Sequence, residues 1–264
     1  MKKLFFFPFA LLCLFSVAQN KKTGKNFFEL RVYEYKSEKQ QTVIDQYLKD
    51  AFKPYMQSKG IHKIGVFAPI TNDTAALKRI YVLIPYKDLN QIPQMHRGLM
   101  ADKEVAEKGA EYLNAGMESP AYTRMITYLL EGFRFAPALM LPKLNSPLEE
   151  HIYELRSYEG PSEKKYLKKV EMFNEGGEIE IFSRLNFNPV FYAETISGPT
   201  MPNLMYMTSF ENMKDRDAHW AAFRDDPQWK ELLTRKEFDK TVSKNVTLLL
   251  KARPYSDYQL RHIR

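Results

Sequence analysis

"FFELRVYEYK", residues Phe27 to Lys36, is followed about 125 residues later by "IYELRSYEGP", residues Ile152 to Pro161. Both stretches contain the core Glu-Leu-Arg-x-Tyr. Apolar and polar residues alternate in each, and β-forming residues are frequent, so each stretch predicts a β-strand. A predicted strand that recurs with Glu and Arg at the same positions indicates that a larger unit has been duplicated.

Three further pairs of segments recur in the same order at nearly the same spacing. The pairs are "HKIGVFAP" (62–69) with "FNPVFYAE" (187–194), "RIYVLIPYKDL" (79–89) with "NLMYMTSFENM" (203–213), and "QMHRGLMADKE" (94–104) with "DAHWAAFRDDP" (217–227). Together with the opening motif they predict an internal repeat, which has to be recognised before the fold is assigned.

Both copies have the predicted order strand, helix, strand, strand, helix, strand. In the first copy we expect strands at 28–35, 61–70, 78–86 and 122–133 and helices at 38–58 and 89–114. In the second copy we expect strands at 152–158, 178–195, 204–210 and 242–253 and helices at 162–174 and 215–237. This β-α-β-β-α-β order is that of the ferredoxin-like module.

A ferredoxin-like module leaves one face of its antiparallel sheet bare, and large bare apolar faces are rare in soluble proteins. A second copy can cover that face. The predicted fold class is therefore α+β, with two tandem ferredoxin-like modules packed sheet to sheet as an intrachain α+β barrel. We assign the first module to residues 27–135, a linker to 136–150 and the second module to 151–257.

The first residues have the features of an export signal. Lys2 and Lys3 precede an apolar run from Leu4 to Phe15, and Ser16-Val17-Ala18 fits the small-x-small cleavage rule. We predict a signal peptide at 1–18 and a periplasmic or extracellular protein without stable membrane insertion after cleavage; an uncleaved anchor is the competing interpretation. Cys13 is the only cysteine and lies in this leader, so we expect no disulfide and no thiol chemistry in the mature chain.

Charge and motifs exclude several functions. The formal net charge of +7 is modest for 264 residues and is spread along the chain, whereas a nucleic-acid footprint is larger and one-sided. The densest basic run, "EKKYLKK" (163–169), is typical of a solvated helix face. No phosphate-binding loop, dinucleotide fingerprint or Gly-x-Ser-x-Gly motif occurs. The histidines lack metal-ligand spacing, so we predict no metal site. The charge distribution predicts no nucleic-acid partner.

Side chains alternate across a strand, so the repeated motif divides into an apolar row and a polar row. We expect the apolar rows to face the helices and the polar rows to point between the two sheets. Such charges are either a structural ion-pair network, a pocket in which arginine anchors a small anionic or oxygen-rich ligand, or a wet surface. The candidate ligand-binding residues are Glu29, Arg31, Tyr33, Glu154, Arg156 and Tyr158.

Two histidines fall at nearly equivalent places in the copies. His96 and His219 lie near the start of the second predicted helix of each module. His219, beside Trp220, is a weak candidate for an acid–base catalyst. Either histidine could supply the axial ligand that a haem needs, but nothing in the local sequence demands one, and we predict no cofactor.

The sequence resembles the NIPSNAP family. The resemblance is carried by "YELRSYEG" (153–160), "LMYMTSFENMKDRDAHWAAFRDDPQWK" (204–230) and "LLLKARPYSD" (248–257). The first copy keeps "FELRVY" but reads "ADKEVAEKG" (101–109) where the second has the "DDPQW" pattern. The resemblance implies a dimeric α+β barrel and says little about activity. The departures in the first copy argue against two symmetric sites, so a pocket, if there is one, is expected in one half only.

Three functional hypotheses follow. The first is an exported NIPSNAP-like tandem protein that binds a small polar or anionic ligand between its sheets. The second is a cofactor-light isomerase, cyclase or monooxygenase of the α+β-barrel type that uses His219 or a carboxylate as base. The third is an interaction module without a pocket. Further homo-oligomerisation is compatible with all three.

Overall fold

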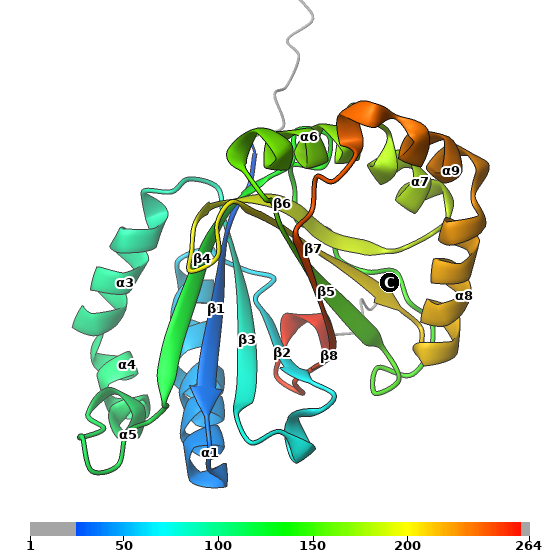
Figure 1. The fold of residues 1–264 in the computed structure, drawn as a ribbon. Coiled ribbons are helices and arrows are strands. Elements are labelled where there is room, and N and C mark those ends of the chain that lie inside the picture. The colour runs from blue at the N-terminus through cyan, green and yellow to red at the C-terminus, as the bar shows by residue number, and fades with distance from the viewer. Residues whose placement is uncertain (1–24, 260–264) are drawn as a thin grey trace, which may run out of the picture.

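The computed structural model describes residues 25–259, so the signal peptide predicted for residues 1–18 lies outside the described part. Eight antiparallel strands form a closed barrel in this part of the chain (Figure 1). Around the ring the strands follow the order β1-β3-β2-β8-β5-β7-β6-β4. Residues 25–259 contain no helix with the length and hydropathy that a membrane span requires.

The first module supplies the first four strands. Its elements are β1 (Phe27–Tyr35), α1 (Glu38–Gln46), a π-helical turn (Tyr47–Phe52), α2 (Lys53–Ser58), β2 (Gly65–Pro69), a 3₁₀ turn (Asn72–Thr74), β3 (Lys78–Tyr86), α3 (Gln91–Ala101), α4 (Lys103–Lys108), α5 (Ala110–Leu113) and β4 (Arg124–Gly132).

The second module repeats this plan. Its elements are β5 (Ile152–Glu159), α6 (Glu163–Phe173), α7 (Glu178–Arg184), β6 (Pro189–Ser197), β7 (Asn203–Phe210), α8 (Met213–Asp225), α9 (Pro227–Thr234), a 3₁₀ turn (Lys236–Phe238), β8 (Lys244–Ala252) and a 3₁₀ turn (Asp257–Gln259).

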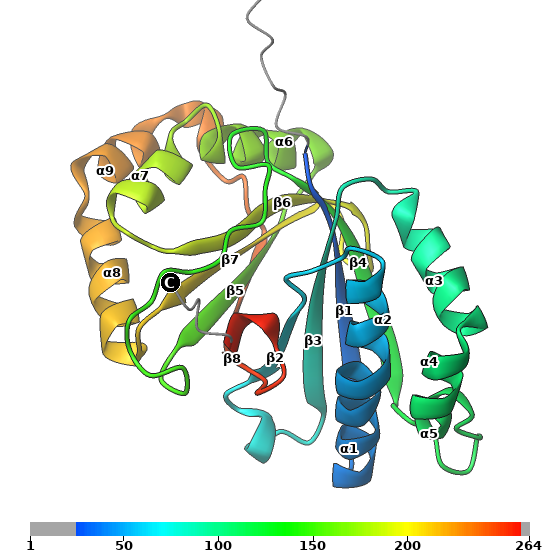
Figure 2. The same ribbon diagram turned by 180° about the vertical axis from the view of Figure 1, so that it is seen from behind.

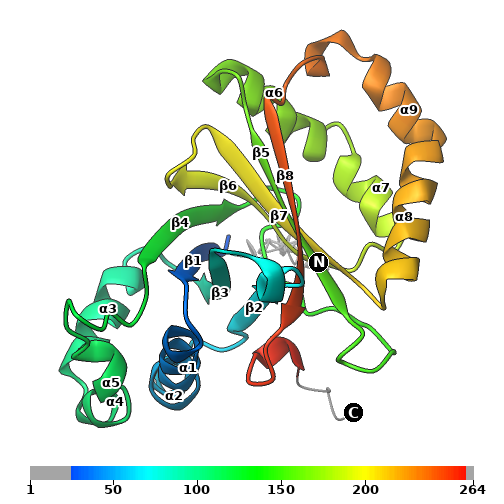
Figure 3. The same ribbon diagram turned by 60° about the horizontal axis from the view of Figure 1, so that its bottom comes forward.

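The two modules close on each other at two seams. Within each module the sheet follows the same order, β4-β1-β3-β2 in the first and β8-β5-β7-β6 in the second. β2 pairs with β8 at one seam, and β4 pairs with β6 at the other. The helices of the two modules lie on opposite outer sides of the barrel (Figures 2 and 3). The predicted intrachain α+β barrel is confirmed.

Local sequence explains where the helices begin and end. The side chains of Ser37, Ser162, Asn212 and Asp226 each accept a hydrogen bond from a backbone N–H of the first helical turn, which satisfies donors that a helix start leaves free. Gly60 follows α2 with φ +80°, a conformation that glycine adopts without steric cost.

The helices expected at 89–114 and 215–237 are each broken into shorter helices, and two of the predicted strands differ from the structure. The strand expected at 178–195 is wrong in its first part, because Glu178–Arg184 is helix α7 and only Pro189–Ser197 is strand β6. The alternating "EIEIF" pattern imitates a strand, but a short apolar run is ambiguous between the two structures. The strand expected at 61–70 is shorter, Gly65–Pro69.

The barrel interior is filled by the apolar rows of the repeated strands. Phe28, Leu30 and Val32 of β1 belong to one buried cluster with Tyr153 and Leu155 of β5. The predicted orientation of the motif is therefore wrong: the apolar rows face the barrel interior, and the polar rows face the helices. An eight-stranded barrel is just wide enough for side chains to fill it, which leaves little room to solvate or pair charges inside.

Candidate functional site

In the first module the polar row forms a closed ion-pair network under the helices. Arg31 donates from Nη2 to Glu29 Oε1 at 2.8 Å and from Nη1 to the Tyr33 hydroxyl at 3.2 Å. Its Nη2 also lies 2.9 Å from Nε2 of His96 on α3. Arg31 is 5% exposed and Glu29 is fully buried. All three guanidinium nitrogens of Arg31 have hydrogen-bond partners within the network.

The environment of Glu29 favours its charged form. Burial alone would raise the pKa of this carboxyl, but the charge of Arg31 and the hydrogen bond with His96 outweigh it and lower the pKa to about 2. The Tyr86 hydroxyl donates to the second carboxylate oxygen at 3.2 Å. Glu29 is therefore ionised at neutral pH, and its carboxylate contacts Arg31, Tyr86 and His96.

In the second module the same motif recruits different helix partners. Arg156 donates from Nε to Glu154 Oε1 at 2.5 Å and from Nη1 to the Tyr158 hydroxyl at 3.2 Å. The other carboxylate oxygen of Glu154 accepts from Arg216 Nε at 2.6 Å and from Trp220 Nε1 at 2.9 Å, both on α8. Both carboxylate oxygens of Glu154 therefore accept hydrogen bonds without using either Nη atom of Arg156.

Arg156 faces a pocket of about 360 Å³ between the sheet and helices α6, α8 and α9, which we call the helix-side pocket. The Arg156 side chain is 15% exposed. Its guanidinium lies 3.8 Å from the ring centroid of Trp220. Among residues 25–259, its Nη2 has no hydrogen-bond partner. Tyr158 also lines the pocket, and its hydroxyl lies 2.9 Å from that of Tyr206.

A buried ion pair lies at the side of the helix-side pocket. Lys169 of α6 donates from Nζ to Glu178 Oε2 at 2.7 Å, and both residues are buried. Burial raises the pKa of the Glu178 carboxyl, and the charge of Lys169 only partly offsets this effect. Arg224, an exposed residue of α8, adds a cation at the pocket edge.

The remaining walls of the helix-side pocket are largely aromatic. Trp220, Phe223 and Trp229 line it, together with Val242 and Asn245. The chain contains two tryptophans, and both are in this wall. Aromatic walls with a few placed polar groups are typical of small-molecule sites.

Tyrosines occupy the corresponding region of the first module. The rings of Tyr47 and Tyr112 stack with centroids 3.9 Å apart, and Tyr33 packs edge-on against Tyr112. The Tyr112 hydroxyl lies 3.4 Å from that of Tyr33. This packing closes the space beside Arg31, whereas the space beside Arg156 is open.

His219 does not reach the polar row. Its Nδ1 lies 2.8 Å from the Asp215 carbonyl oxygen one turn earlier in α8, and its ring packs against Phe187 and Phe210. It is not among the residues that line the helix-side pocket. The expected equivalence with His96 is therefore not spatial: His96 contacts Glu29, whereas Arg216 and Trp220 hold the equivalent Glu154.

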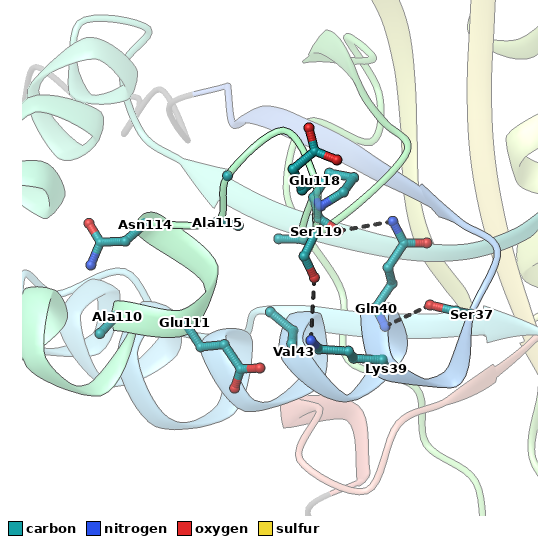
Figure 4. Close-up of a pocket in the computed structure, with 13 residues that line it drawn as sticks. Ser37, Lys39, Gln40, Val43, Ala110, Glu111, Asn114, Ala115, Glu118 and Ser119 are labelled. Atoms are coloured by element: carbon teal, nitrogen blue, oxygen red, sulfur yellow. Dashed lines mark hydrogen bonds between the residues drawn. The ribbon is translucent and has the colours of Figure 1, made fainter.

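Figure 4 shows a larger cleft, about 490 Å³, between the start of α1 and the loop after α5. Lys39 donates to the Ser119 hydroxyl at 3.3 Å, and Gln40 donates to the Pro120 carbonyl at 3.0 Å. These bonds tie the loop to α1 and engage Lys39, the one basic residue in the lining of this cleft. The cleft also has no aromatic ring in its lining, so we favour the helix-side pocket.

Of the residues proposed from the sequence, which were expected between the sheets, Arg156 and Tyr158 line the helix-side pocket, and its other charged residues, Lys169, Glu178 and Arg224, were not proposed. Lys169 is the last residue of a basic run interpreted as a solvated face, yet it is buried. Its position three residues after Tyr166 and four before Phe173 puts it on the apolar face of α6, a signal that was present in the sequence. Glu178 and Arg224 carried no such signal. In residues 25–259 no group of three or more His, Cys, Asp or Glu side chains is placed to hold a metal.

Solved structures with similar folds extend over most of the chain. A protein named as a candidate monooxygenase from Lactobacillus acidophilus is 13% identical, covers 86% of this chain and 94% of its own, and has a TM-score of 0.57. An anthrone oxidase-like protein is 10% identical, covers 87% of this chain and 92% of its own, and has a TM-score of 0.51. At these identities the likeness shows the fold alone.

Comparison with shorter chains and with families gives a more specific result. A NIPSNAP family protein from Agrobacterium tumefaciens is 22% identical, covers 42% of this chain and 99% of its own, with a TM-score of 0.36. A comparison with curated proteins found no match. The NIPSNAP family model matches twice, at residues 28–129 and 153–257, which together exceed half of the chain. This protein belongs to the NIPSNAP family and carries two copies of its domain.

Proposed function

We propose that the second module binds a small organic anion with a flat or aromatic body in the helix-side pocket. The observation that carries this proposal is that Nη2 of Arg156 has no hydrogen-bond partner among residues 25–259, while Arg156 lines a pocket walled by both tryptophans. Arginine is suited to such a role because its planar guanidinium hydrogen-bonds carboxylates in a fixed geometry.

The charges around the pocket favour an anion. Arg156, Lys169 and Arg224 contribute three cations, and Glu178 is the one acidic residue in the lining. Glu154 lies behind Arg156 and is already held by Arg216 and Trp220. A carboxylate ligand would therefore meet a positive surplus that protein groups have not neutralised.

The aromatic wall favours a ring as the body of the ligand. Trp229 and Phe223 lie with ring centroids 4.4 Å apart, and Trp220 already stacks with the Arg156 guanidinium. A flat ligand can add to this stack without breaking hydrogen bonds, and each aromatic pair contributes about 0.5–1.5 kcal/mol beyond its buried area.

Arg156→Met is expected to weaken binding of benzoate by roughly tenfold to a hundredfold, the loss that a charge-assisted hydrogen bond of about 1.5–3 kcal/mol implies. Binding is measured by tryptophan fluorescence, which reports on this pocket because both tryptophans line it. Benzamide, which has the same shape and no charge, is expected to bind weakly to the unaltered protein and to Arg156→Met alike.

Arg216→Met is the matched control. It also removes an arginine from Glu154, but Arg216 does not line the pocket. Arg224→Met, paired with Lys214→Met on the same helix outside the pocket, is the companion test with little risk to folding. If folded Arg156→Met and Arg224→Met bind benzoate as tightly as their controls do, the pocket does not bind anions.

A second candidate function is proton transfer on the bound anion. The buried Glu178 carboxyl has a raised pKa and lines the same pocket, and such groups are frequent among catalytic acids and bases. The enzyme names of the fold neighbours do not decide this, because their identities are 10–13%.

Phenylpyruvate tests this candidate because it combines an aromatic ring, a carboxylate and an acidic benzylic C–H. A basic carboxylate at Glu178 would take up that proton and leave the enolate. After the Glu178 carboxyl exchanges its proton with D₂O, a deuteron returns to the benzylic carbon, so we expect the protein to accelerate loss of the benzylic proton NMR signal in D₂O. Glu178→Gln is expected to abolish the acceleration, with Glu180→Gln on the same helix as control. Equal exchange with and without protein would leave binding as the only function supported.

The location of this activity follows from the leader predicted at residues 1–18. We propose that the protein is exported and meets its ligand in the periplasm or outside the cell. Native mass spectrometry of protein isolated from its host would show whether residues 1–18 are removed and whether a small anion is retained.

A further inference from the structure

A third cavity, separate from the helix-side pocket and from the cleft at α1, opens at one end of the barrel. Its volume is about 230 Å³, and residues from β1, β3, β4, β5, β7 and β8 line it, so both modules contribute. We call it the barrel-mouth cavity. It exists only because the two sheets close on each other, and it lies on the opposite face of the sheet from the helix-side pocket. It is independent of the function proposed above.

The floor of the barrel-mouth cavity is apolar. Val32, Leu155 and Met205 lie there, each between 1% and 4% exposed. Val246 and Leu248 of β8 form a half-buried wall above them. An apolar molecule would remove this surface from water, which is favourable by about 25 cal/mol per Å².

The rim is charged but already neutralised. Arg79 pairs with Glu34 at 2.9 Å, and Lys244 pairs with Glu159 at 3.2 Å. Glu34 and Glu159 occupy the same place in the two copies, one residue after the motif tyrosine. With equal numbers of cations and anions, the rim gives no advantage to a charged ligand, which would lose hydration without gaining a free partner.

A single neutral polar group can be accommodated beside Ser157. The Ser157 hydroxyl lines the cavity and donates its proton to Asn203 Oδ1 at 3.1 Å. Its lone pairs are therefore turned to other donors, and an alcohol O–H is such a donor.

We propose that the barrel-mouth cavity binds a small uncharged molecule with an apolar chain and one hydroxyl group, such as a medium-chain alcohol. Cavities of about 150 Å³ with apolar walls bind molecules of the size of benzene, so the volume suffices for a compact chain. The hydroxyl group lies at Ser157, and the chain lies over Leu155 and Met205.

The test uses the full chain with ¹³C-labelled methionine methyl groups and 1-octanol as the probe. The Met205 signal is expected to shift saturably and to show nuclear Overhauser contacts with the octanol chain, whereas Met117, which is 89% exposed, stays unchanged. Octanoate, titrated against the same Met205 signal, is expected to bind at least tenfold more weakly than octanol. Benzoate, the probe of the helix-side pocket, is expected to leave the Met205 signal unchanged. The octanol result therefore tests the barrel-mouth cavity alone, and the benzoate result tests the helix-side pocket alone.

Val246→Phe fills the cavity from its wall and is expected to reduce octanol affinity at least tenfold. Thr247→Phe is the matched control, because Thr247 is the next residue on β8, exposed and outside the cavity lining. The proposal is overturned if Met205 of the unaltered protein shows no contact with octanol, or if folded Val246→Phe binds octanol as tightly as Thr247→Phe does. The first of these outcomes needs no variant to fold.

Discussion

Arg31→Met is expected to lower the free energy of unfolding by about 3–5 kcal/mol, the loss typical of breaking one side of a buried ion pair. Glu29 is fully buried, and two nitrogens of Arg31 hold the same carboxylate oxygen. Without the guanidinium, Glu29 retains only the Tyr86 hydroxyl and the half-exposed His96. Urea unfolding followed by circular dichroism measures the loss.

Arg156→Met provides the internal comparison, because it makes the same change at the equivalent place of the second copy. Glu154 retains two strong donors, Arg216 and Trp220, and the lost guanidinium was partly exposed to the pocket. We expect a smaller loss, about 1–3 kcal/mol. Equal losses in the two variants would contradict the division into a structural copy and a ligand-facing copy.

Glu29→Gln is expected to flatten the acid limb of the stability profile. The folded-state pKa of Glu29 is lowered from 4.5 to about 2, so its contribution to stability is complete above the unfolded pKa and is lost as the pH falls toward 2. A shift of this size corresponds to roughly 3 kcal/mol. The free energy of unfolding of the unaltered protein should therefore fall between pH 5 and about 2 more steeply than that of the variant, although the variant is less stable at pH 7.

The matched control for this pH dependence is Glu107→Gln, which neutralises an exposed carboxylate of α4. Its stability profile should run parallel to that of the unaltered protein across the acid range. If Glu29→Gln also runs parallel, Glu29 does not have the low folded-state pKa that its contacts with Arg31 and His96 indicate.

The two copies show how one motif supports two outcomes. In both, an arginine pairs with the glutamate two residues earlier and reaches the tyrosine two residues later. What differs is the helix side: His96 and a stack of tyrosines close the first copy, whereas Trp220 and Trp229 leave a pocket in the second. Side chains far from the motif in sequence decide whether its arginine is free to bind a ligand.

Because residues distant in sequence shape the pocket, only some of its lining residues could be predicted from local patterns. Arg156 was proposed because a charged residue in a predicted strand needs a partner or a ligand, and Tyr158 because it lies in the same polar row. Glu178 was not, because its helix was predicted as a strand and its role depends on Lys169, nine residues earlier on another helix. Contacts of that kind have no local sequence signal.

The pattern of residues alone predicts that the chain is two ferredoxin-like modules closed into one barrel. The reason is that the repeated order of strands and helices leaves each sheet one uncovered face, which only the other copy can cover. Which row of each strand faces the barrel interior depends on the packing of the whole fold. Both faces of these strands are buried. Alternation in the sequence shows that the two faces differ, but it does not show which face lies toward the barrel interior and which toward the helices. The narrow barrel interior accepts Leu30 and Leu155, and the helix side provides the partners that Arg31 and Arg156 need.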